Sequence, residues 1–575
     1  MNLTGSSIEN SLANKEGGSV KPLVLLVAGL TCVGFFTSHA SMSLDPPNRL
    51  KVTQSIVDHG DIQVRLTADE EAHPEHMGVA TTIGADGNRY LAYHGIGQSL
   101  LFVPPYYVVR HLLGIESPKL TRSLISLTLF PLTLGLTAWI FFLLLREFGF
   151  PDRRCFLASI LVVLGTGLWE LSRECQDDSH LAFLFVLTAY GLRRYQKTAA
   201  LRFLALSSVS IGFAFITRSD TAPTVLCFLL FAFWLIYRGH RDAGQSQGHA
   251  VRIWPYLLVL GLTFPALVIE ISHNLFRFSH PIMSYEVSSL MPYEMDRAEL
   301  LILGLKGLLL SPGKSIFLYN PLVILAVPGL FYLWQRHRGW ALYIFAGFTG
   351  CLLLHAAYPS FHGNICWGAR YLCRYLPLLL LPAVVFAFAD GPLSKIRLWL
   401  FGLVACASVV VQVASVSLHY NRDILELDMA YEETWSEKGW TMFEPEAHFL
   451  ERRFGNIATS VSDMAHGRIA PWPTDPTYTI TQAEQLQVPA LNYLAFWPFH
   501  LTYYLPSTRP DLAVPLWAST LIFLGGVAVG LLLLLWGWRS CTHRMGSAKV
   551  VRQRPQDSEH VSAARISATS PAGPT

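Results

Sequence analysis

The strongest constraint on the fold is the recurrence of apolar runs about as long as a helix needs to cross a bilayer. Such a helix takes roughly 20 predominantly apolar residues. Only 14% of the residues are charged, against about 25% in soluble proteins. The sequence therefore predicts an all-α polytopic membrane protein with about twelve transmembrane helices. The predicted spans are residues 21–40, 121–145, 154–171, 179–195, 201–217, 221–238, 253–271, 316–335, 340–358, 370–388, 396–417 and 512–538.

Lysine and arginine concentrate in every second connection between these runs. Loops rich in these residues stay on the cytoplasmic side, so the basic connections and both termini are predicted to be cytoplasmic. The other connections are then on the outer face. The basic positions are Arg146, Arg153 and Arg154; Arg193, Arg194, Lys197 and Arg202; Arg238, Arg241 and Arg252; Arg336 and Arg338; Lys395 and Arg397; and Arg539, Arg544, Lys549, Arg552 and Arg554.

The topology divides the chain into a membrane module and flanking segments. We expect a disordered cytoplasmic tail over 1–20, a catalytic transmembrane module over 21–417 with a first outer loop over 41–120, a small outer subdomain over 418–511, a last span over 512–538 and a disordered tail over 539–575. The run from Pro22 to Ala40 has an alternative as a signal peptide, because Ser38-His39-Ala40 faintly resembles a cleavage site.

Two apolar outer segments are too broken or too short to be convincing spans. Tyr90–Leu113 contains Pro104-Pro105, and Leu300–Leu310 is too short to cross. We expect both to be helices lying in the outer interface, in the first and fourth outer loops. The alternative, in which Tyr90–Leu113 crosses the membrane, would invert every later loop against its charges.

Acids near the predicted outer boundary are candidates for catalysis. Asp45 directly follows the first apolar run, and Asp177 and Asp178 lie between the third and fourth. A carboxylate there is costly to desolvate unless it is paired, in water or functional. Such a group could accept a proton from an attacking hydroxyl. The alternative is that these acids only cap helices. Asp45 would cap the helix that starts at Pro46-Pro47, and the Asp177-Asp178 pair would cap the fourth span.

Cations form a complementary set near the same boundary. Arg218, Arg277, Lys314, Arg370 and Arg374 fall in different outer loops. Arginine suits bidentate phosphate contacts, so these side chains are candidates to hold a phosphate. Snorkelling to the interface is the alternative for each of them taken singly.

Other outer polar and aromatic residues fit contacts with a substrate. His94 and His362 could contact sugar or phosphate, and Trp367 and Tyr371 could stack on a sugar. The alternative for the histidines is that they form hydrogen bonds within the protein at the interface. The alternative for the aromatic residues is an interfacial aromatic belt. The chain shows no HExxH, HxH or CxxC spacing, so we expect no metal and no other cofactor, although a divalent cation stays possible. The small formal charge of +3 and the absence of a basic patch argue against nucleic acid.

Four stretches resemble the GT-C superfold of polyprenyl-phosphate-dependent glycosyltransferases, in particular the bacterial protein O-mannosyltransferase and aminoarabinose-transferase-like group. The resemblance covers residues 20–540. It is carried by Asp45 with Asn48-Arg49 and 55–60; by 84–87 leading to 93–100; by His273–Phe278 with Pro281 and 307–315; and by Trp367–Leu372.

The resemblance implies roles for particular side chains. Asp45 would be the base, Asp177 or Asp178 would assist, and Arg277, Lys314 and Arg370 would hold the donor phosphate, with Arg218 beside them. Gln98, in the stretch that resembles the interfacial helix, would bind substrate. Pro46-Pro47 stands where well-characterised members have a second acid, and Tyr93-His94-Gly95 stands in place of their Lys-Pro-Pro. Neither mannose nor aminoarabinose transfer is therefore carried over.

The resemblance predicts a membrane glycosyltransferase in the bacterial inner membrane, with its active site on the periplasmic face. Its partners would be membrane lipids, a polyprenyl-phosphate sugar donor and a lipid, glycan or protein acceptor. The main alternative is a non-enzymatic lipid or glycolipid transporter. Transporters tend to show internal repeats and ionisable groups near the midplane, whereas this sequence shows no repeat and places its charges at the outer boundary. A degenerate relative that acts as a scaffold is a third alternative.

Overall fold

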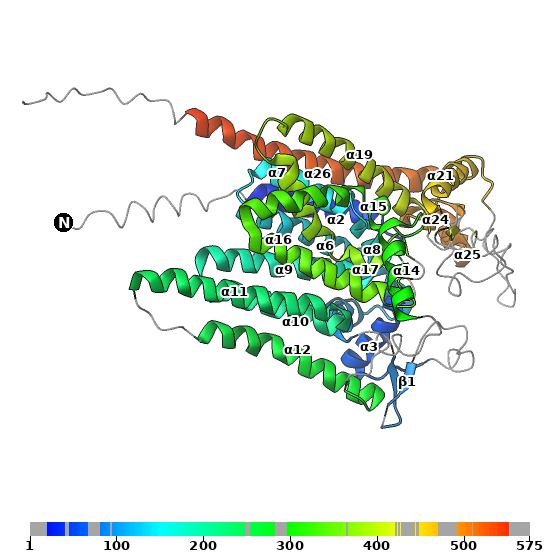
Figure 1. The fold of residues 1–575 in the computed structure, drawn as a ribbon. Coiled ribbons are helices and arrows are strands. Elements are labelled where there is room, and N and C mark those ends of the chain that lie inside the picture. The colour runs from blue at the N-terminus through cyan, green and yellow to red at the C-terminus, as the bar shows by residue number, and fades with distance from the viewer. Residues whose placement is uncertain are drawn as a thin grey trace, which may run out of the picture.

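The computed structural model is a bundle of long helices that run side by side, with short elements gathered at one end (Figure 1). The short elements at that end include α3, β1, α14, α17, α21 and α24. The structure describes residues 20–40, 45–66, 81–84, 86–92, 95–247, 253–281, 296–363, 366–419, 422–423, 426, 443, 448–469, 492–508 and 510–550.

The described residues are mostly helical. The long helices are α2 (Val20–Phe36), α6 (Pro118–Glu147), α7 (Asp152–Leu164), α9 (Asp177–Thr198), α10 (Leu201–Thr217), α11 (Ala222–Gln247), α12 (Trp254–Phe278), α16 (Ala326–Ala356), α18 (Leu376–Phe388), α19 (Ser394–Ser417) and α26 (Leu516–Val550). The shorter elements are α3 (Asp45–His59), β1 (Thr81–Ile83), β2 (Arg89–Leu91), α5 (Gly97–Tyr107), η2 (Val108–Leu112), α8 (Leu168–Arg173), η3 (Ser219–Thr221), α14 (Arg297–Leu310), α15 (Ile316–Tyr319), η4 (Pro321–Leu325), α17 (Arg370–Cys373), α21 (Phe449–Ala465), α24 (Trp497–Tyr503), α25 (Leu505–Thr508) and η7 (Pro510–Leu512).

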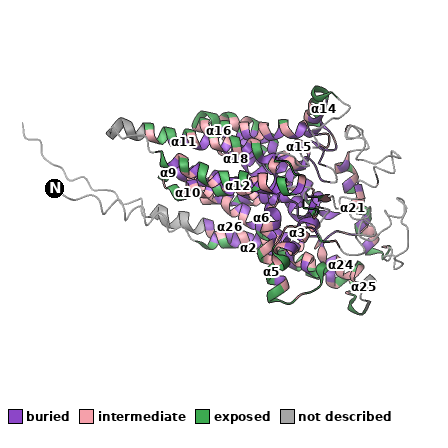
Figure 2. Cartoon of the chain, turned by 90° about the horizontal axis from the view of Figure 1, so that it is seen from below, coloured by how far each residue is buried: buried purple, intermediate pink, exposed green. Residues whose placement is uncertain are grey.

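Membrane-spanning helices are confirmed by length and composition. Among the described residues, six helical segments are long and apolar enough to cross a bilayer, and α2, α10 and α18 are shorter apolar helices. Figure 2 shows exposed residues along the outward sides of the long helices, including α11. Large exposed apolar side chains such as Phe264 on α12 and Trp399 on α19 fit contact with lipid.

One of the six candidates, Pro321–Ala356, is two helices rather than one. The backbone at His337 is non-helical, with φ −144° and ψ 63°. Asn320, before the first half, accepts a hydrogen bond from the Gly167 amide, and His355, at the end of the second, reaches Asp220. The ring of His337 instead packs on Phe148, at the other end of the bundle. The chain therefore reverses at His337, as the separate predicted runs 316–335 and 340–358 require.

Helices α2 and α26 pack closely because glycines face each other across their contact. A Cβ added to Gly29 would lie 2.9 Å from the Gly530 carbonyl oxygen, and one on Gly530 would lie 2.7 Å from Val33. Small residues let helix backbones approach inside a membrane, where packing rather than hydrophobic burial drives association. The first predicted span is thus part of the bundle.

The segment predicted as the first outer loop departs from the all-α prediction. Strands β1 and β2 form an antiparallel hairpin, with Thr82 opposite Tyr90, around a turn that contains Asp86-Gly87. Gly87 has φ +78°, a conformation that favours glycine, and Asp86 accepts a hydrogen bond from the Tyr90 hydroxyl at 2.5 Å. Asp-Gly between strands is a common hairpin signal. Tyr90 is therefore in a strand, and the helix predicted over 90–113 begins only at Gly97.

The other predicted boundaries agree with the structure to different degrees. Helix α14 covers the predicted interfacial segment 300–310. Helix α26 continues to Val550, past the predicted end of the last span at 538, because no proline interrupts it before Pro555. The 1–20 prediction lies almost entirely outside the described residues. Of 418–511, the structure describes chiefly α21, α24 and α25.

The glycine contact predicts a sharp difference between two positions on α26. Gly530→Val should lower the free energy of unfolding by about 1–3 kcal/mol, because the added atoms force α2 and α26 apart. Gly525, five residues earlier, has nothing within 4 Å of its added Cβ, so Gly525→Val should match wild type more closely. Unfolding midpoints in the same detergent would measure both, and equal midpoints would contradict the contact.

Candidate functional site

The most distinctive feature of the end that holds α3 and α17 is a buried set of ion pairs. Its members come from α3, α9, α16, α17, η3 and the residues that follow α10 and α17. We call this set the Arg–Asp cluster: Arg49, Arg218, Arg370, Arg374, Asp177, Asp178, Asp220 and His355.

Asp177 and Asp178 form the centre of the cluster at the start of α9. Arg49 pairs with Asp177 at 2.9 Å, and Arg218 and Arg370 approach the same carboxylate at 3.6 and 3.5 Å. Asp178 is held by Arg370 at 2.9 Å and by Arg374 at 2.8 Å. Both acids lie in the first turn of α9, where the helix dipole also favours negative charge. The predicted capping position is occupied by Gln176 instead.

Asp220 is the third carboxylate of the cluster. Its carboxylate pairs with Arg218 at 2.7 Å and with Arg374 at 2.6 Å. The Nε2 atom of His355 lies 3.1 Å from the same group. Arg374 thus bridges Asp178 and Asp220, so α9, η3, α16 and α17 are tied together through two carboxylates.

Helix α3 enters the cluster through Arg49. Gln98 on α5 accepts a hydrogen bond from Arg49 and donates one to the Cys175 carbonyl at 3.2 Å, which fixes the guanidinium. Asp45 is the first residue of α3, four positions before Arg49. Residues four apart lie on the same face of a helix, so Asp45 is one turn from the cluster. The side chain of Asp45 lies outside the described part of the chain.

The cluster is almost completely buried. Each of its eight side chains is at most 8% exposed to solvent. Four guanidinium groups face three carboxylates, so the set carries an excess of positive charge before His355 is counted. Fixed cations in a water-poor site stabilise negative charge that develops during a reaction.

Lys314 extends this positive region. The sequence Ser311-Pro312-Gly313-Lys314-Ser315 forms a tight turn, in which Ser311 accepts from the Lys314 amide at 3.0 Å. The Lys314 ammonium donates to the Cys366 carbonyl, and Arg370 contacts the Cys366 sulfur at 3.7 Å. Burial lowers the pKa of Lys314 to about 8. The Lys314 ammonium is therefore mostly charged at neutral pH and loses its charge as the pH rises through about 8.

Three of the predicted substrate-binding residues, Tyr371, Trp367 and His362, lie near the Arg–Asp cluster or near Lys314. Tyr371 stacks on His355 at 4.6 Å and lies under Arg218, so it belongs beside the cluster. Trp367 packs edge-on against Tyr319 at 4.9 Å and lies under Arg453 of α21. His362 is buried, and burial together with the charge of Lys314 lowers its pKa to about 3. His94 lies outside the described residues.

Arg277 belongs to a different group of polar residues on α12. It donates to the Leu91 carbonyl at 3.3 Å and to Asn274 at 2.7 Å, and it lies 3.9 Å from Glu270. These three partners are not members of the Arg–Asp cluster. Glu270 is an acid buried in a membrane-spanning helix. Such an acid is usually functional or paired.

Several of the candidate residues selected from the sequence lie together in the structure. The structure brings Asp177, Asp178, Arg218 and Arg370 into direct contact and places Lys314 beside them. Arg374, a predicted phosphate-binding candidate, bridges Asp178 and Asp220 instead. Arg49, Asp220, His355 and Glu270 were not assigned a role. A local signal existed for one of them, because Asp220 stands two residues after Arg218.

Comparison with known families agrees with the resemblance seen in the sequence. Residues 113–277 match the family described as dolichyl-phosphate-mannose-protein mannosyltransferase. The predicted resemblance is confirmed over this segment. The matched segment holds Asp177, Asp178 and Asp220, which supply all the carboxylates of the cluster, and it also holds Arg218. The match indicates a glycosyltransferase.

Two solved structures are similar at low identity. ArnT from Cupriavidus metallidurans bound to undecaprenyl phosphate shares 14% identity, with 87% of this chain and 90% of that chain covered and a TM-score of 0.43. The same protein in the apo state shares 13% identity, with 86% and 88% covered and a TM-score of 0.42. No curated protein matches the sequence.

The cluster predicts that Arg374 contributes strongly to stability. Arg374→Ala leaves Asp178 and Asp220 without a shared partner, and breaking a buried ion pair typically costs about 3–5 kcal/mol. Arg468, which pairs with Asp463 near the surface at 54% exposure, provides the matched control. Arg468→Ala should cost about 0–1 kcal/mol. Chemical unfolding of the two variants in detergent would measure the difference, and equal losses would contradict the buried role of Arg374.

Proposed function

We propose that this protein transfers a sugar from a polyprenyl-phosphate donor to a hydroxyl group of an acceptor. The observation that carries the proposal is the buried excess of arginine at the Arg–Asp cluster, one helical turn from Asp45. The family match over residues 113–277 supports the same reaction class. A donor with a lipid phosphate presents both a negative charge for the arginines and a tail that stays in the membrane.

We further propose that twelve helical segments cross the membrane and that the cluster lies at the outer face. The twelve are α2, α6, α7, α9, α10, α11, α12, the two halves of α16, α18, α19 and α26. The opposite end, at His337, carries Arg193 and Arg194, among the basic residues predicted to be cytoplasmic. This arrangement supports cytoplasmic termini and a periplasmic site in a bacterial inner membrane.

The proposed reaction is a single displacement at the anomeric carbon of the donor. The acceptor oxygen forms a bond to that carbon as the bond to the phosphate oxygen breaks, and Asp45 takes the hydroxyl proton. The departing polyprenyl phosphate gains negative charge, which Arg218, Arg370 and Lys314 stabilise. With no covalent intermediate, the configuration at the anomeric carbon inverts.

The geometry favours a positioning role for Asp177 and Asp178. Each carboxylate is engaged by two or more arginines, which are themselves the groups suited to phosphate. The two acids therefore hold the guanidinium groups in place, while Asp45 remains the candidate base. Arg277 lies in the α12 group and would contact a more distant part of the donor.

A transfer assay tests the base. Purified protein in liposomes would receive labelled polyprenyl-phosphate sugars and a panel of hydroxyl acceptors. Asp45→Asn should lower the transfer rate by about 10²–10⁴-fold, the usual contribution of general base catalysis. Asp86→Asn, in the exposed hairpin turn of the same loop, should retain the wild-type rate.

Two outcomes of this assay would overturn the proposal in different ways. Full activity in Asp45→Asn would remove the base assignment and leave the reaction class. Movement of unmodified donor lipid across the bilayer, with no transfer to any acceptor, would favour a transporter instead.

The low pKa of Lys314 predicts a pH dependence for donor use. If its ammonium binds the donor phosphate, kcat/KM for the donor should begin to fall as pH rises through about 8, where the charge is lost. Lys314→Arg keeps the charge to higher pH and should remove that fall. Initial rates from pH 6 to 10 would show it. A flat wild-type profile, or the same fall in Lys314→Arg, would contradict contact between Lys314 and the phosphate.

A further inference from the structure

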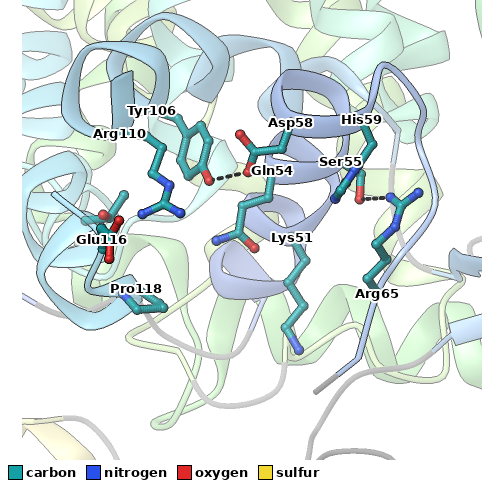
Figure 3. A pocket seen from close by; sticks show the side chains of 11 residues that line it. Lys51, Gln54, Ser55, Asp58, His59, Arg65, Tyr106, Arg110, Glu116 and Pro118 are labelled. Atoms are coloured by element: carbon teal, nitrogen blue, oxygen red, sulfur yellow. Dashed lines mark hydrogen bonds between the residues drawn. The ribbon is translucent and has the colours of Figure 1, made fainter. Parts of the chain in front are cut away.

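A second polar site lies on the other side of α3 from the Arg–Asp cluster. It is a cavity of about 210 Å³ between α3, the end of α5, η2 and the start of α6. Figure 3 shows Gln54 and Arg110 pointing into it from opposite sides, with Lys51 and Glu116 at its edge. None of these side chains has a part in the proposed displacement.

The position of the cavity follows from the periodicity of α3. Arg49 faces the cluster, and Thr53 donates to the Ser99 carbonyl on the same side. Lys51, Gln54 and Asp58 follow Arg49 by two, five and nine residues, which at 3.6 residues per turn places them on the opposite face. An α-helix with its side chains is about 10–12 Å across, so the two sites are separated by roughly that distance.

The walls of the cavity are held by hydrogen bonds to neighbouring elements. Asp58 accepts from the Tyr106 hydroxyl at 2.8 Å and lies 3.3 Å from His111. Arg65 donates to Ser55 at 2.8 Å and pairs with Asp61 at 2.6 Å. The adjacent residue Val64 is fixed by a backbone hydrogen bond to Arg89 of β2. The site is thus built by three separate parts of the first outer loop.

The charges of the cavity distinguish it from the cluster. Lys51, Arg65 and Arg110 are balanced by Asp58 and Glu116 in the lining and by Asp61 behind Arg65. A balanced set offers no general attraction for an anion. It does place hydrogen-bond donors and acceptors side by side, which suits a hydroxyl group, because each hydroxyl both donates and accepts.

The volume limits what the cavity can hold. Sites for drug-sized ligands measure about 300–1,000 Å³, so 210 Å³ accommodates one ring and not an extended chain. We propose that this cavity binds a single neutral sugar ring through its hydroxyl groups. Resting on the proposed function, we assign that ring to a glycan-bearing acceptor, because the donor phosphate would occupy the opposite face of α3.

Direct binding tests the site without any turnover. Purified full-length protein in a detergent that contains no sugar would be mixed with methyl α-glucoside, methyl α-mannoside or methyl α-galactoside. Saturation-transfer NMR would detect the bound probe. Maltoside detergents are avoided because their head groups would compete.

Two substitutions and a matched control localise the binding. Gln54→Leu and Arg110→Leu should each weaken binding of the neutral glycoside at least about tenfold, because each removes donors that the cavity provides. Lys119→Leu, an exposed lysine in the first turn of α6 outside the lining, should bind as wild type does. Asp58 is left intact because it holds Tyr106 and His111 in place.

The outcomes separate this proposal from the proposed reaction. Binding that is lost in both cavity variants and kept in Lys119→Leu and Asp45→Asn supports the sugar site, whether or not transfer is observed. The proposal is overturned if no neutral glycoside binds wild type, or if the two cavity variants bind normally. Stronger binding of methyl glucuronide or inorganic phosphate would overturn the preference for a neutral ring.

Kinetics then test the assignment to the acceptor. With a glycan acceptor that supports transfer, Gln54→Leu and Arg110→Leu should raise KM for the acceptor about tenfold and leave KM for the donor unchanged. A rise confined to the donor KM would refute the acceptor assignment, and an unchanged acceptor KM would do the same.

Discussion

Charged groups removed from water must find partners, and in this protein that requirement joins segments from most of the membrane module. Moving a carboxylate or guanidinium out of water costs several kcal/mol, which only close opposite charges and hydrogen bonds offset. Asp177, Asp178 and Asp220 are each shared by two or more cations, and Arg374 serves two of the acids. Loss of one segment would leave charges unpaired in several others, so the pairs specify how α3, α9, α16 and α17 meet.

The cluster also explains why the short helix α3 is placed as it is. Arg49 anchors one face of α3 to α9, while Gln98 and Ser99 attach it to α5. With that face fixed, the opposite face must point toward Tyr106 and Arg110, which close the second cavity. A single helix of 15 residues therefore separates a cationic region suited to phosphate from a charge-balanced cavity suited to hydroxyl groups.

Local sequence pattern predicted the helices well because apolar run length and flanking charge act within one segment. The predicted runs 201–217 and 253–271 correspond to α10 and α12, and the break between 335 and 340 corresponds to the reversal at His337. The β1–β2 hairpin was missed although Asp86-Gly87 carried its turn signal, because the surrounding apolar residues favoured a helix.

The site was harder to predict because its contacts join distant parts of the sequence. Asp177 and Asp178 were identified from their position at a boundary, but their partners at Arg49 and Arg374 come from segments with no shared local pattern. Arg277 looked equivalent to Arg218 and Arg370 by position, yet its neighbours are Leu91 and Asn274. Depth in the membrane can be read from sequence, whereas lateral placement around the bundle cannot.

The pairing of α2 with α26 has a consequence for how the protein is made. The Cys32 thiol donates to the Gly526 carbonyl at 3.4 Å across a separation of 494 residues, and the Trp497 amide donates to the Ser38 carbonyl at 2.8 Å. Helix α2 is therefore synthesised long before its partner α26, because 494 residues separate the two contacting positions. Until then the glycine face of α2 is open to lipid, to chaperones or to other helices in the insertion machinery. Closure of the bundle is thus a late step of biogenesis, and sequence-distant contacts of this kind form slowly.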